Sequence, residues 1–331
     1  MKLFALTFGD IHTPSSHFRI HQYEERFRAA GIKLEHALAR GFRDFGYLKT
    51  CDVVMLQKTL LATSTIRKIR RASNVLIYDA DDRIWMRPGK PYGWATRSRL
   101  NRRLKAIVST ADLCIAANRV IAADQEGAGS TNVEVLPMSV DTSQWKPGVA
   151  SELRSDRVTI GWSGAPRNLV FLEPLLPALR EILRQNKNVR LAIHSGERPS
   201  FDDIDFEHLP FEPGLEPKAV AQFDIGLLPL PDDPFVHGKS PIKALQYSAC
   251  GVPIVGQAVG ATAELLQHEV NGLTVTDERS WLQNLQRLVT DSDLRVQLGE
   301  GGKTMVERSH SMDAVFGRYL SLLQSALEPA Q

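Results

Sequence analysis

Short apolar runs recur along this chain, and polar stretches with helical spacing lie between them. Each run is nearly continuous rather than alternating, which is typical of strands buried on both faces of a parallel sheet. The helical spacing is clearest over residues 18–30 and 64–72. In the first half of the chain the apolar runs occupy residues 2–8, 52–57, 74–78, 113–117 and 133–136.

The same rhythm restarts after a poorly periodic stretch, residues 139–156, which we interpret as a linker. A helix is expected from about residue 168, and strands are expected at 158–162, 189–194, 225–228 and 252–255. Two series of alternating strands and helices predict an α/β protein with two doubly wound, Rossmann-like parallel-sheet domains that face a cleft. We expect these domains at 1–145 and 146–310, followed by a C-terminal helix within 311–331 that packs back on the first domain.

Composition excludes several classes of protein. The chain has 331 residues, 43 % of them hydrophobic and 24 % charged, with a net charge of +2, so it is neither disordered nor highly charged. No apolar run approaches the roughly 18 residues that a membrane span needs. The cysteines lie far apart and predict neither a disulfide framework nor a zinc site, so we expect a cytoplasmic protein. They are Cys51, Cys114 and Cys250.

The charge is unevenly distributed. Residues 1–150 contain 23 Lys and Arg against 14 Asp and Glu, whereas the remainder contains 17 against 24. The basic half is expected to face an anionic membrane or a phosphorylated substrate, unless the cations are only clustered by chance on solvated helices. One basic helix, residues 64–72, carries Arg67, Lys68, Arg70 and Arg71.

The segment from Gly238 to Gln246 opens a helix and predicts an anion site. Ser240 is expected to cap the helix and Pro241 to occupy its first position, with Ile242 following. Lys239 and Lys243 then lie at a helix start, where positive charge is unfavourable unless an anion binds there. The alternative is a pair of solvated lysines, which costs little at a surface.

A second turn, Ser163-Gly164 followed by Arg167, also comes between a strand and a helix. Glycine permits close approach to the backbone, and an arginine binds phosphate through two nitrogens. An ordinary strand-to-helix turn is the alternative. The segment lacks the G-x-G-x-x-G spacing, so nicotinamide binding is not indicated. His194 follows a later strand, at a place suited to a base or ribose contact.

In the first half, three carboxylates follow one strand: Asp79, Asp81 and Asp82. They would bind a metal, pair with the adjacent Arg83, cap the next segment or orient substrate hydroxyl groups, and the last reading fits a cleft position best. The loop before the first helix contains Ser15 and Ser16 as candidate caps, and Arg19 is expected to reach the cleft. No Ser-His-Asp arrangement stands out.

The segments "GWSGAPRNLVFLEPLLPAL", "GKSPIKALQYSACGVPIVG" and "YDADDRIW" resemble bacterial glycosyltransferases of the GT-B fold, and are similar to family 4, whose members are retaining and use nucleotide sugars. The resemblance implies a donor site in the second domain. Arg167, Lys239 and Lys243 would hold the diphosphate together with Ser163, Gly164 and the helix start.

The sequence departs from that family where many members carry two glutamates eight residues apart. Gly238 and Gln246 occupy the matching positions. Gln246 can still bond to ribose hydroxyls, whereas Gly238 offers no side chain to the donor sugar. In the first domain, Asp81 or Asp82 stands where the family often has a histidine near the sugar, and Ser15 and Ser16 match a glycine-rich loop by position only.

The resemblance implies a glycosyltransferase that moves a sugar from a UDP- or GDP-sugar to an acceptor hydroxyl with retention. The acceptor is expected to be a glycan or lipid-linked intermediate of surface polysaccharide synthesis. We expect no metal, no other cofactor and no bound nucleic acid. The protein would lie at the inner face of the membrane. We assign catalysis to Lys239, Lys243, Arg167 and Asp82. The alternatives are a non-catalytic partner that binds nucleotide sugar and, on the same fold, a nucleotide-sugar epimerase.

Overall fold

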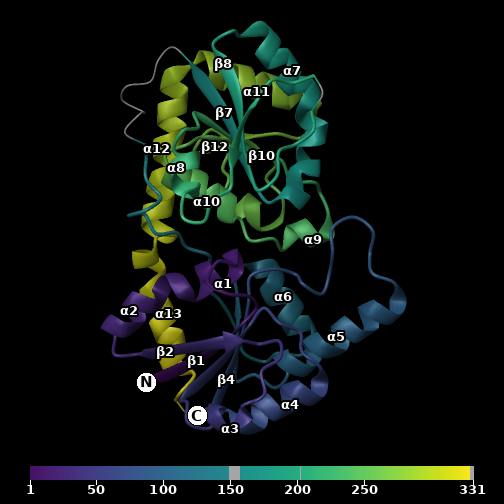
Figure 1. Cartoon of the computed structure of the whole chain (residues 1–331), viewed down its shortest axis with the longest axis vertical. Coiled ribbons are helices and arrows are strands. Elements are labelled where there is room, and N and C mark those ends of the chain that lie inside the picture. Colours follow the sequence, from purple (N-terminus) through teal and green to yellow (C-terminus); the bar gives the residue numbers. More distant parts are fainter. Residues whose placement is uncertain (149–156, 202, 329–331) are drawn as a thin grey trace. The chain divides into compact units, whose positions relative to one another are not determined.

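The computed structural model describes residues 1–148, 157–201 and 203–328, which form two compact units (Figure 1). Unit 1 comprises Met1–Met138, Asp233–Ser240 and Met312–Gln331, and unit 2 comprises Ser139–Asp232 and Pro241–Ser311. Each unit contains a six-stranded sheet in which the paired strands are parallel. Part of the expected linker, residues 149–156, lies outside the described residues.

The sheet of unit 1 has the strand order β2-β1-β3-β4-β5-β6. The inner strands β1, β3, β4 and β5 are almost wholly buried, as their apolar runs predict. β2 is a half-exposed edge strand that the apolar pattern does not reveal. The strands are β1 (Lys2–Thr7), β2 (Lys33–Leu38), β3 (Val53–Gln57), β4 (Val75–Ala80), β5 (Leu113–Ala116) and β6 (Val133–Val135).

Helices cover both faces of this sheet. One face carries α3 (Phe45–Leu48), α4 (Thr63–Ala72), α5 (Trp94–Val108) and α6 (Arg119–Gly127), whose apolar residues share a core. The opposite face carries α1 (Pro14–Arg19), η1 (His21–Tyr23), α2 (Glu24–Ala29) and α13 (Met312–Ser325). The single helix expected over 18–30 is wrong, because Ile20 leaves helical geometry and a 3₁₀ turn separates α1 from α2.

Unit 2 repeats the architecture, with strand order β12-β11-β10-β7-β8-β9. The strands are β7 (Val158–Ser163), β8 (Val189–Ser195), β9 (Glu207–Pro210), β10 (Ile225–Leu228), β11 (Ile254–Gly256) and β12 (Gly272–Thr274). The helices are η3 (Pro166–Leu175), α7 (Leu176–Gln185), α8 (Glu216–Val220), α10 (Ile242–Ala249), η4 (Gly260–Glu264), α11 (Glu278–Thr290) and α12 (Ser292–Ser309). One short helix between β10 and α10, α9 (Pro234–His237), belongs to unit 1.

No helix among the described residues has both the length and the apolar character needed to cross a bilayer. Cys51, Cys114 and Cys250 are buried free thiols.

Candidate functional site

A buried polar cluster lies where β7 and β8 of unit 2 end. Ser163 closes β7, His194 is the penultimate residue of β8, and Lys243 lies in the first turn of α10. Ser163 Oγ is 2.9 Å from His194 Nδ1 and accepts a hydrogen bond of 3.2 Å from Lys243 Nζ. The Ser163 backbone N–H donates to the hydroxyl of Tyr247, which lies one turn further along α10 (2.8 Å). We call these four residues the Ser163 cluster.

At Ser163 Oγ the Lys243 ammonium can only donate, whereas the Ser163 hydroxyl and His194 Nδ1 share a hydrogen bond whose direction depends on the imidazole tautomer. Burial lowers the pKa of His194 to about 4, and the positive charge of Lys243 adds to this effect. His194 is therefore neutral at physiological pH, and Lys243 supplies the positive charge.

The start of α10 differs from the sequence prediction. The helix begins at Ile242, Pro241 stands at the N-cap, and no side chain caps the first turn. Ser240 is not the cap, because its hydroxyl donates to the backbone carbonyl of Asp81 in unit 1. Proline has no N–H to offer, so the uncapped donors of this helix start belong to the residues that follow it.

Gln246 lies one turn along the same helix and is 3 % exposed, yet its Oε1 has no hydrogen-bond partner among the described residues. Arg167 is exposed near the start of η3, and we find no ion pair or hydrogen bond for it in the described part of the chain. Gly164 donates its N–H to the His194 carbonyl (3.0 Å), and a Cβ on Gly164 would overlap the Trp162 ring. Unit 2 thus brings Ser163, Gly164, His194 and Lys243 into contact.

Gly238, Lys239 and Ser240 belong to unit 1 instead. The Gly238 carbonyl accepts from Asn118 Nδ2 (3.2 Å), and Lys239 lies in the turn that closes α9, where its ammonium is 6.0 Å from the Phe235 ring centre. Helix α10 thus begins one residue later than expected: Lys243 lies in its first turn, as predicted, and Lys239 lies three residues before Ile242, in the turn after α9.

The space beside position 238, where the resembling family often has a glutamate, is occupied by another side chain. A Cβ on Gly238 would overlap the aliphatic part of the Arg83 side chain. Arg83 is fixed by Asp124, to which its Nε and Nη2 donate at 2.7 and 2.8 Å, and by the Pro234 carbonyl. Any side chain at position 238 would therefore require Arg83 to move.

A second polar cluster lies at the carboxyl edge of the sheet of unit 1. Ser15 Oγ donates to Asp81 (2.6 Å) and accepts from Gln57 Nε2 (2.8 Å), while Ser16 Oγ donates to Gln57 Oε1 (3.2 Å). Neither serine caps α1, because Thr13 precedes that helix and Ser16 instead accepts from the Gly9 N–H (3.1 Å). Both serines are committed to this network.

Lys58 completes this network, and the sequence analysis missed it. Its ammonium donates to Asp82 (2.8 Å) and to Asp81 (3.4 Å), and its backbone has a left-handed φ of 47°. Burial alone would lower the pKa of Lys58, but the two carboxylates overcome that effect and raise it. We call Ser15, Ser16, Gln57, Lys58, Asp81 and Asp82 the Asp81 cluster. The available signal was a lysine directly after a buried strand.

These pairings answer one of the alternatives for the three aspartates, the pairing with Arg83. Lys58, rather than Arg83, balances Asp81 and Asp82, and Oδ1 of Asp82 is buried without a hydrogen-bond partner among the described residues. Within the described ranges no three His, Cys, Asp or Glu side chains are grouped to hold a metal ion. Asp82 Oδ1 is thus an acceptor suited to a hydroxyl group.

Arg19 has a structural role, which corrects the expectation that it reaches a ligand. It is 3 % exposed, binds Asp79 through two nitrogens and donates to the Leu136 carbonyl (2.8 Å). Burial raises the pKa of Asp79 and Arg19 opposes that rise. Burial alone would lower the pKa of Arg19, but Asp79 more than reverses this effect.

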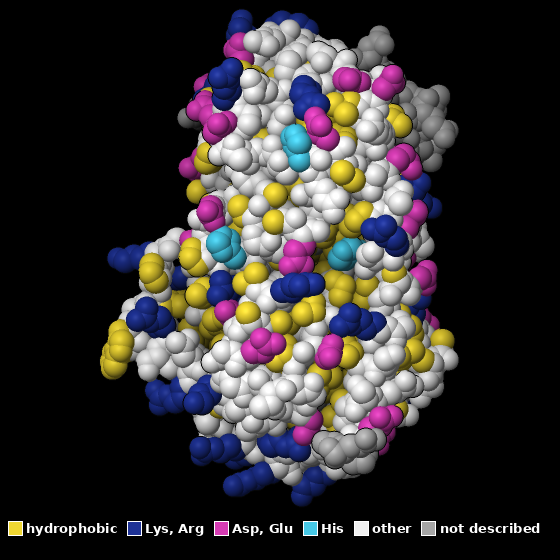
Figure 2. Space-filling model, turned by 180° about the vertical axis from the view of Figure 1, so that it is seen from behind, with side chains coloured by type: hydrophobic (Ala, Val, Ile, Leu, Met, Phe, Trp, Pro, Cys, Tyr) yellow, Lys and Arg dark blue, Asp and Glu magenta, His cyan; other side chains and the backbone are white. Residues whose placement is uncertain are grey.

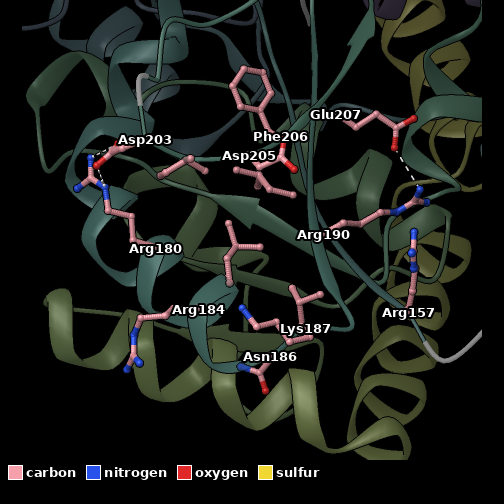
Figure 3. Close-up of a pocket in the computed structure, with 14 residues that line it drawn as sticks. Arg157, Arg180, Arg184, Asn186, Lys187, Arg190, Asp203, Asp205, Phe206 and Glu207 are labelled. Carbon is pink, nitrogen blue, oxygen red and sulfur yellow. Dashed lines mark hydrogen bonds and ion pairs between the residues drawn. The ribbon is translucent and has the colours of Figure 1, made fainter.

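A pocket of about 610 Å³ lies at the other edge of the sheet of unit 2, near the starts of β8 and β9 (Figure 3). Several of its charges are paired: Arg180 with Asp203 (2.7 Å), Arg190 with Glu207 (3.1 Å), and Arg184 with Glu181 on its own helix (2.6 Å). It contains none of the residues proposed above for ligand binding.

Comparison with known families identifies the larger part of unit 2. Residues 157–291 match the family model described as "Glycosyl transferases group 1". This segment is therefore similar to the group 1 glycosyl transferases. It contains the whole Ser163 cluster, Gln246 and Arg167. The resemblance stated from the sequence is confirmed at this level.

Curated relatives of the chain include two proteins named D-inositol 3-phosphate glycosyltransferase. The one from Stackebrandtia nassauensis is 27 % identical over 230 residues, which cover 60 % of this chain and 50 % of the relative. The one from Xylanimonas cellulosilytica is 24 % identical, covering 61 % and 54 %. The chain therefore spans about half the length of the curated relatives it matches.

Solved glycosyltransferase structures share the fold over the whole chain. Sucrose-phosphate synthase from Thermosynechococcus elongatus has a TM-score of 0.73 at 15 % identity, covering 98 % of this chain and 100 % of that structure. Anabaena HepE in complex with UDP-glucose has a TM-score of 0.65 at 15 % identity, covering 98 % and 99 %. The predicted α/β class with two parallel sheets and the GT-B fold is confirmed.

Proposed function

We propose that this chain transfers a sugar from a nucleotide diphosphate sugar to an acceptor hydroxyl with retention of the anomeric configuration. The observation that carries the proposal is the Ser163 cluster, in which a cation on an uncapped helix start stands beside a neutral histidine at the ends of two parallel strands. Ligands of α/β proteins bind beyond the carboxyl ends of such strands. HepE, a protein of the same fold, was solved with UDP and with UDP-glucose, which favours a UDP-sugar over a GDP-sugar.

Negative charge develops on the departing diphosphate as the glycosidic bond lengthens. Lys243, Arg167 and the first N–H groups of α10 would stabilise that charge. We also propose Lys239 as a cation that binds the diphosphate. These groups would replace a divalent metal, so we propose a reaction without metal or other cofactor. The His194 imidazole and the unpartnered Oε1 of Gln246 would bond to the nucleoside, the latter to ribose hydroxyls.

The Asp81 cluster would receive the acceptor. The unpartnered Oδ1 of Asp82 accepts a hydrogen bond from the attacking hydroxyl, and Lys58 and Ser15 hold the two carboxylates in place. We propose a glycan or lipid-linked intermediate of surface polysaccharide synthesis as the acceptor, and a protein that works on the inner face of the membrane.

One observation favours a second candidate, a non-catalytic protein that binds nucleotide sugar. Arg83 fills the space beside Gly238, so the contact that resembling enzymes make to the donor sugar through a glutamate is closed here.

A thermal-shift titration with UDP, GDP, ADP and NAD, with and without EDTA, tests the donor site. We expect a saturable rise with one nucleoside diphosphate that EDTA leaves unchanged. Sugar transfer to a hydroxyl acceptor then separates the two candidates, since the non-catalytic protein would bind nucleotide without transfer.

The double variant Lys239→Ala with Lys243→Ala should lose the shift and most of the activity. The control variant Lys187→Ala with Lys303→Ala removes the same charge at two other positions, both in unit 2. It should retain the thermal shift and the activity. A folded protein that no nucleotide stabilises would contradict both candidates.

A further inference from the structure

Two neighbouring helices of unit 1 concentrate positive charge. Helices α4 and α5 pack side by side on one face of the sheet and together contain nine Lys and Arg and no Asp or Glu. Lys and Arg side chains gather at the lower left of Figure 2. Because that view is turned by 180°, this region corresponds to the lower right of Figure 1, where α4 and α5 lie. We call the exposed residues of these helices, together with two cations of the connection before α5, the basic surface; it comprises Arg67, Lys68, Arg71, Arg87, Lys90, Trp94, Arg97, Arg99, Arg102 and Lys105.

The helices do not balance this charge internally. Of the cations on α4 and α5, Arg70 pairs with Asp112, and we find no other ion pair to these helices within the described residues. Arg99 lies three residues from Arg102 on one helix face, and Arg97 lies in the positively polarised start of α5. Repulsion between like charges and the positive end of the helix dipole both destabilise α5 at these positions. A negatively charged surface in contact with the helix would therefore stabilise it.

Trp94 distinguishes among the possible anionic partners. It is the first residue of α5 and is 78 % exposed, and burial along that helix begins only at Leu104. An exposed tryptophan beside cations suits the boundary of a bilayer, where the ring sits at the level of the lipid headgroups. A polyanion without an apolar layer would leave the Trp94 ring exposed to water.

The connection between β4 and α5 links this surface to the Asp81 cluster. It leaves the carboxyl edge of the sheet with Asp81 and Asp82 and ends at Trp94, where α5 turns back along the sheet. A bilayer at Trp94 would therefore meet the same edge of unit 1 that holds Asp82. This orientation rests on the proposed function, whereas binding to the bilayer does not.

We propose that the basic surface docks unit 1 on an anionic lipid bilayer, with Trp94 seated among the headgroups. The docking would present the acceptor edge of the sheet to a hydroxyl carried by a lipid.

The full chain offers a direct optical test. The other four tryptophans, Trp85, Trp145, Trp162 and Trp281, are only 3–5 % exposed, so lipid contact changes the environment of Trp94 alone. With vesicles of phosphatidylcholine and phosphatidylglycerol in equal parts, we expect co-sedimentation and quenching of tryptophan fluorescence by brominated acyl chains. Pure phosphatidylcholine vesicles should give neither, and high salt should weaken both. Trp94→Phe should abolish the quenching.

Charge-reversal variants complete the test. Arg97→Glu with Arg99→Glu and Arg102→Glu should weaken vesicle binding about tenfold or more. Lys187→Glu with Lys218→Glu and Arg308→Glu makes the same change in net charge on exposed residues of unit 2, and should stay within about twofold of the wild type.

Equal binding to neutral and anionic vesicles, equal loss in both triple variants, or quenching that survives in Trp94→Phe would overturn the proposal. So would binding to heparin that the basic surface requires while vesicles do not bind at all. No donor or acceptor is present in these measurements, so their result is independent of whether the protein transfers sugar.

Discussion

The two polar clusters of this protein balance charge in different ways. In unit 1, Asp79 pairs with Arg19 and Asp124 pairs with Arg83, while Lys58 pairs with both Asp81 and Asp82. In unit 2, the Ser163 cluster combines one ammonium group with a hydroxyl, a phenol and a neutral imidazole, and contains no carboxylate.

The difference separates what holds the fold from what attracts a ligand. Buried carboxylates need their cations for stability, so removing one partner leaves an unpaired charge in a poorly polarisable interior. A cation at a helix start instead creates a positive potential, which a diphosphate would complete. Substitutions at the buried Arg19–Asp79 pair should therefore act mainly on stability, and those in the Ser163 cluster mainly on activity.

The largest effect is expected from Arg19→Met, which leaves Asp79 buried without its cation. We expect a loss of about 3–5 kcal/mol in the free energy of unfolding, measured by urea denaturation. The matched control is Arg28→Met, which breaks the exposed Arg28–Glu25 pair of α2 and should cost at most about 1 kcal/mol. Similar losses in the two variants would show that burial of the Arg19 pair has no special importance.

Lys243→Met should reverse that pattern. Without the ammonium group, charge on the leaving diphosphate loses a fixed cation, and we expect turnover to fall about 100-fold while unfolding changes by less than about 1 kcal/mol. Steady-state kinetics and urea denaturation of the same preparation give both numbers. Lys243→Arg should recover part of the activity, and a Lys243→Met enzyme with near wild-type turnover would refute the role of Lys243.

The histidine of the Ser163 cluster should make stability depend on pH. Its pKa is about 4 in the folded chain and 6.5 ordinarily, so the unfolded state binds the proton first as the pH falls. Stability should therefore decrease from pH 6.5 towards pH 4, by about 1–2 kcal/mol for this group. His194→Gln should make that part of the profile shallower, and the remaining slope comes from His21, whose pKa burial also lowers to about 4. An unchanged profile in His194→Gln would contradict the neutral imidazole.

The smallest effect is expected at Gln246. Gln246→Leu removes the buried acceptor, so the KM for the donor should rise about five- to tenfold, while stability stays equal or increases because an unsatisfied oxygen is lost. Gln246→Glu should keep the KM within a few-fold. If Gln246→Leu lowered stability and left the KM unchanged, the side chain would serve packing and not the donor.

Sequence patterns predicted the inner strands well, because a strand buried on both faces must be continuously apolar, as 53–57 and 225–228 are. They missed β2 and β9, whose edge positions leave their residues half-exposed. β12 also escaped notice, and its three residues are too few to form a pattern.

For the candidate site, local rules placed residues after the correct strands but did not give their partners. Ser240 has the chemistry of a cap, yet a carbonyl from a distant strand takes its hydroxyl. Lys58 and Arg19 were missed or misplaced because their carboxylate partners lie about 23 and 60 residues away along the chain. Such pairings depend on how β3, β4 and α1 assemble, which no short segment specifies.

The position of α13 has a consequence for synthesis on the ribosome. This helix contributes Met312, Val315 and Tyr319 to the core beside Tyr23 and Phe27, yet all of unit 2 is translated before it. Until then one apolar face of the first sheet lacks part of its cover, so the unit that is made first is completed last. While its second half is being synthesised, the nascent chain therefore exposes part of an apolar face of the first sheet. Chaperone binding during translation should concentrate on this face.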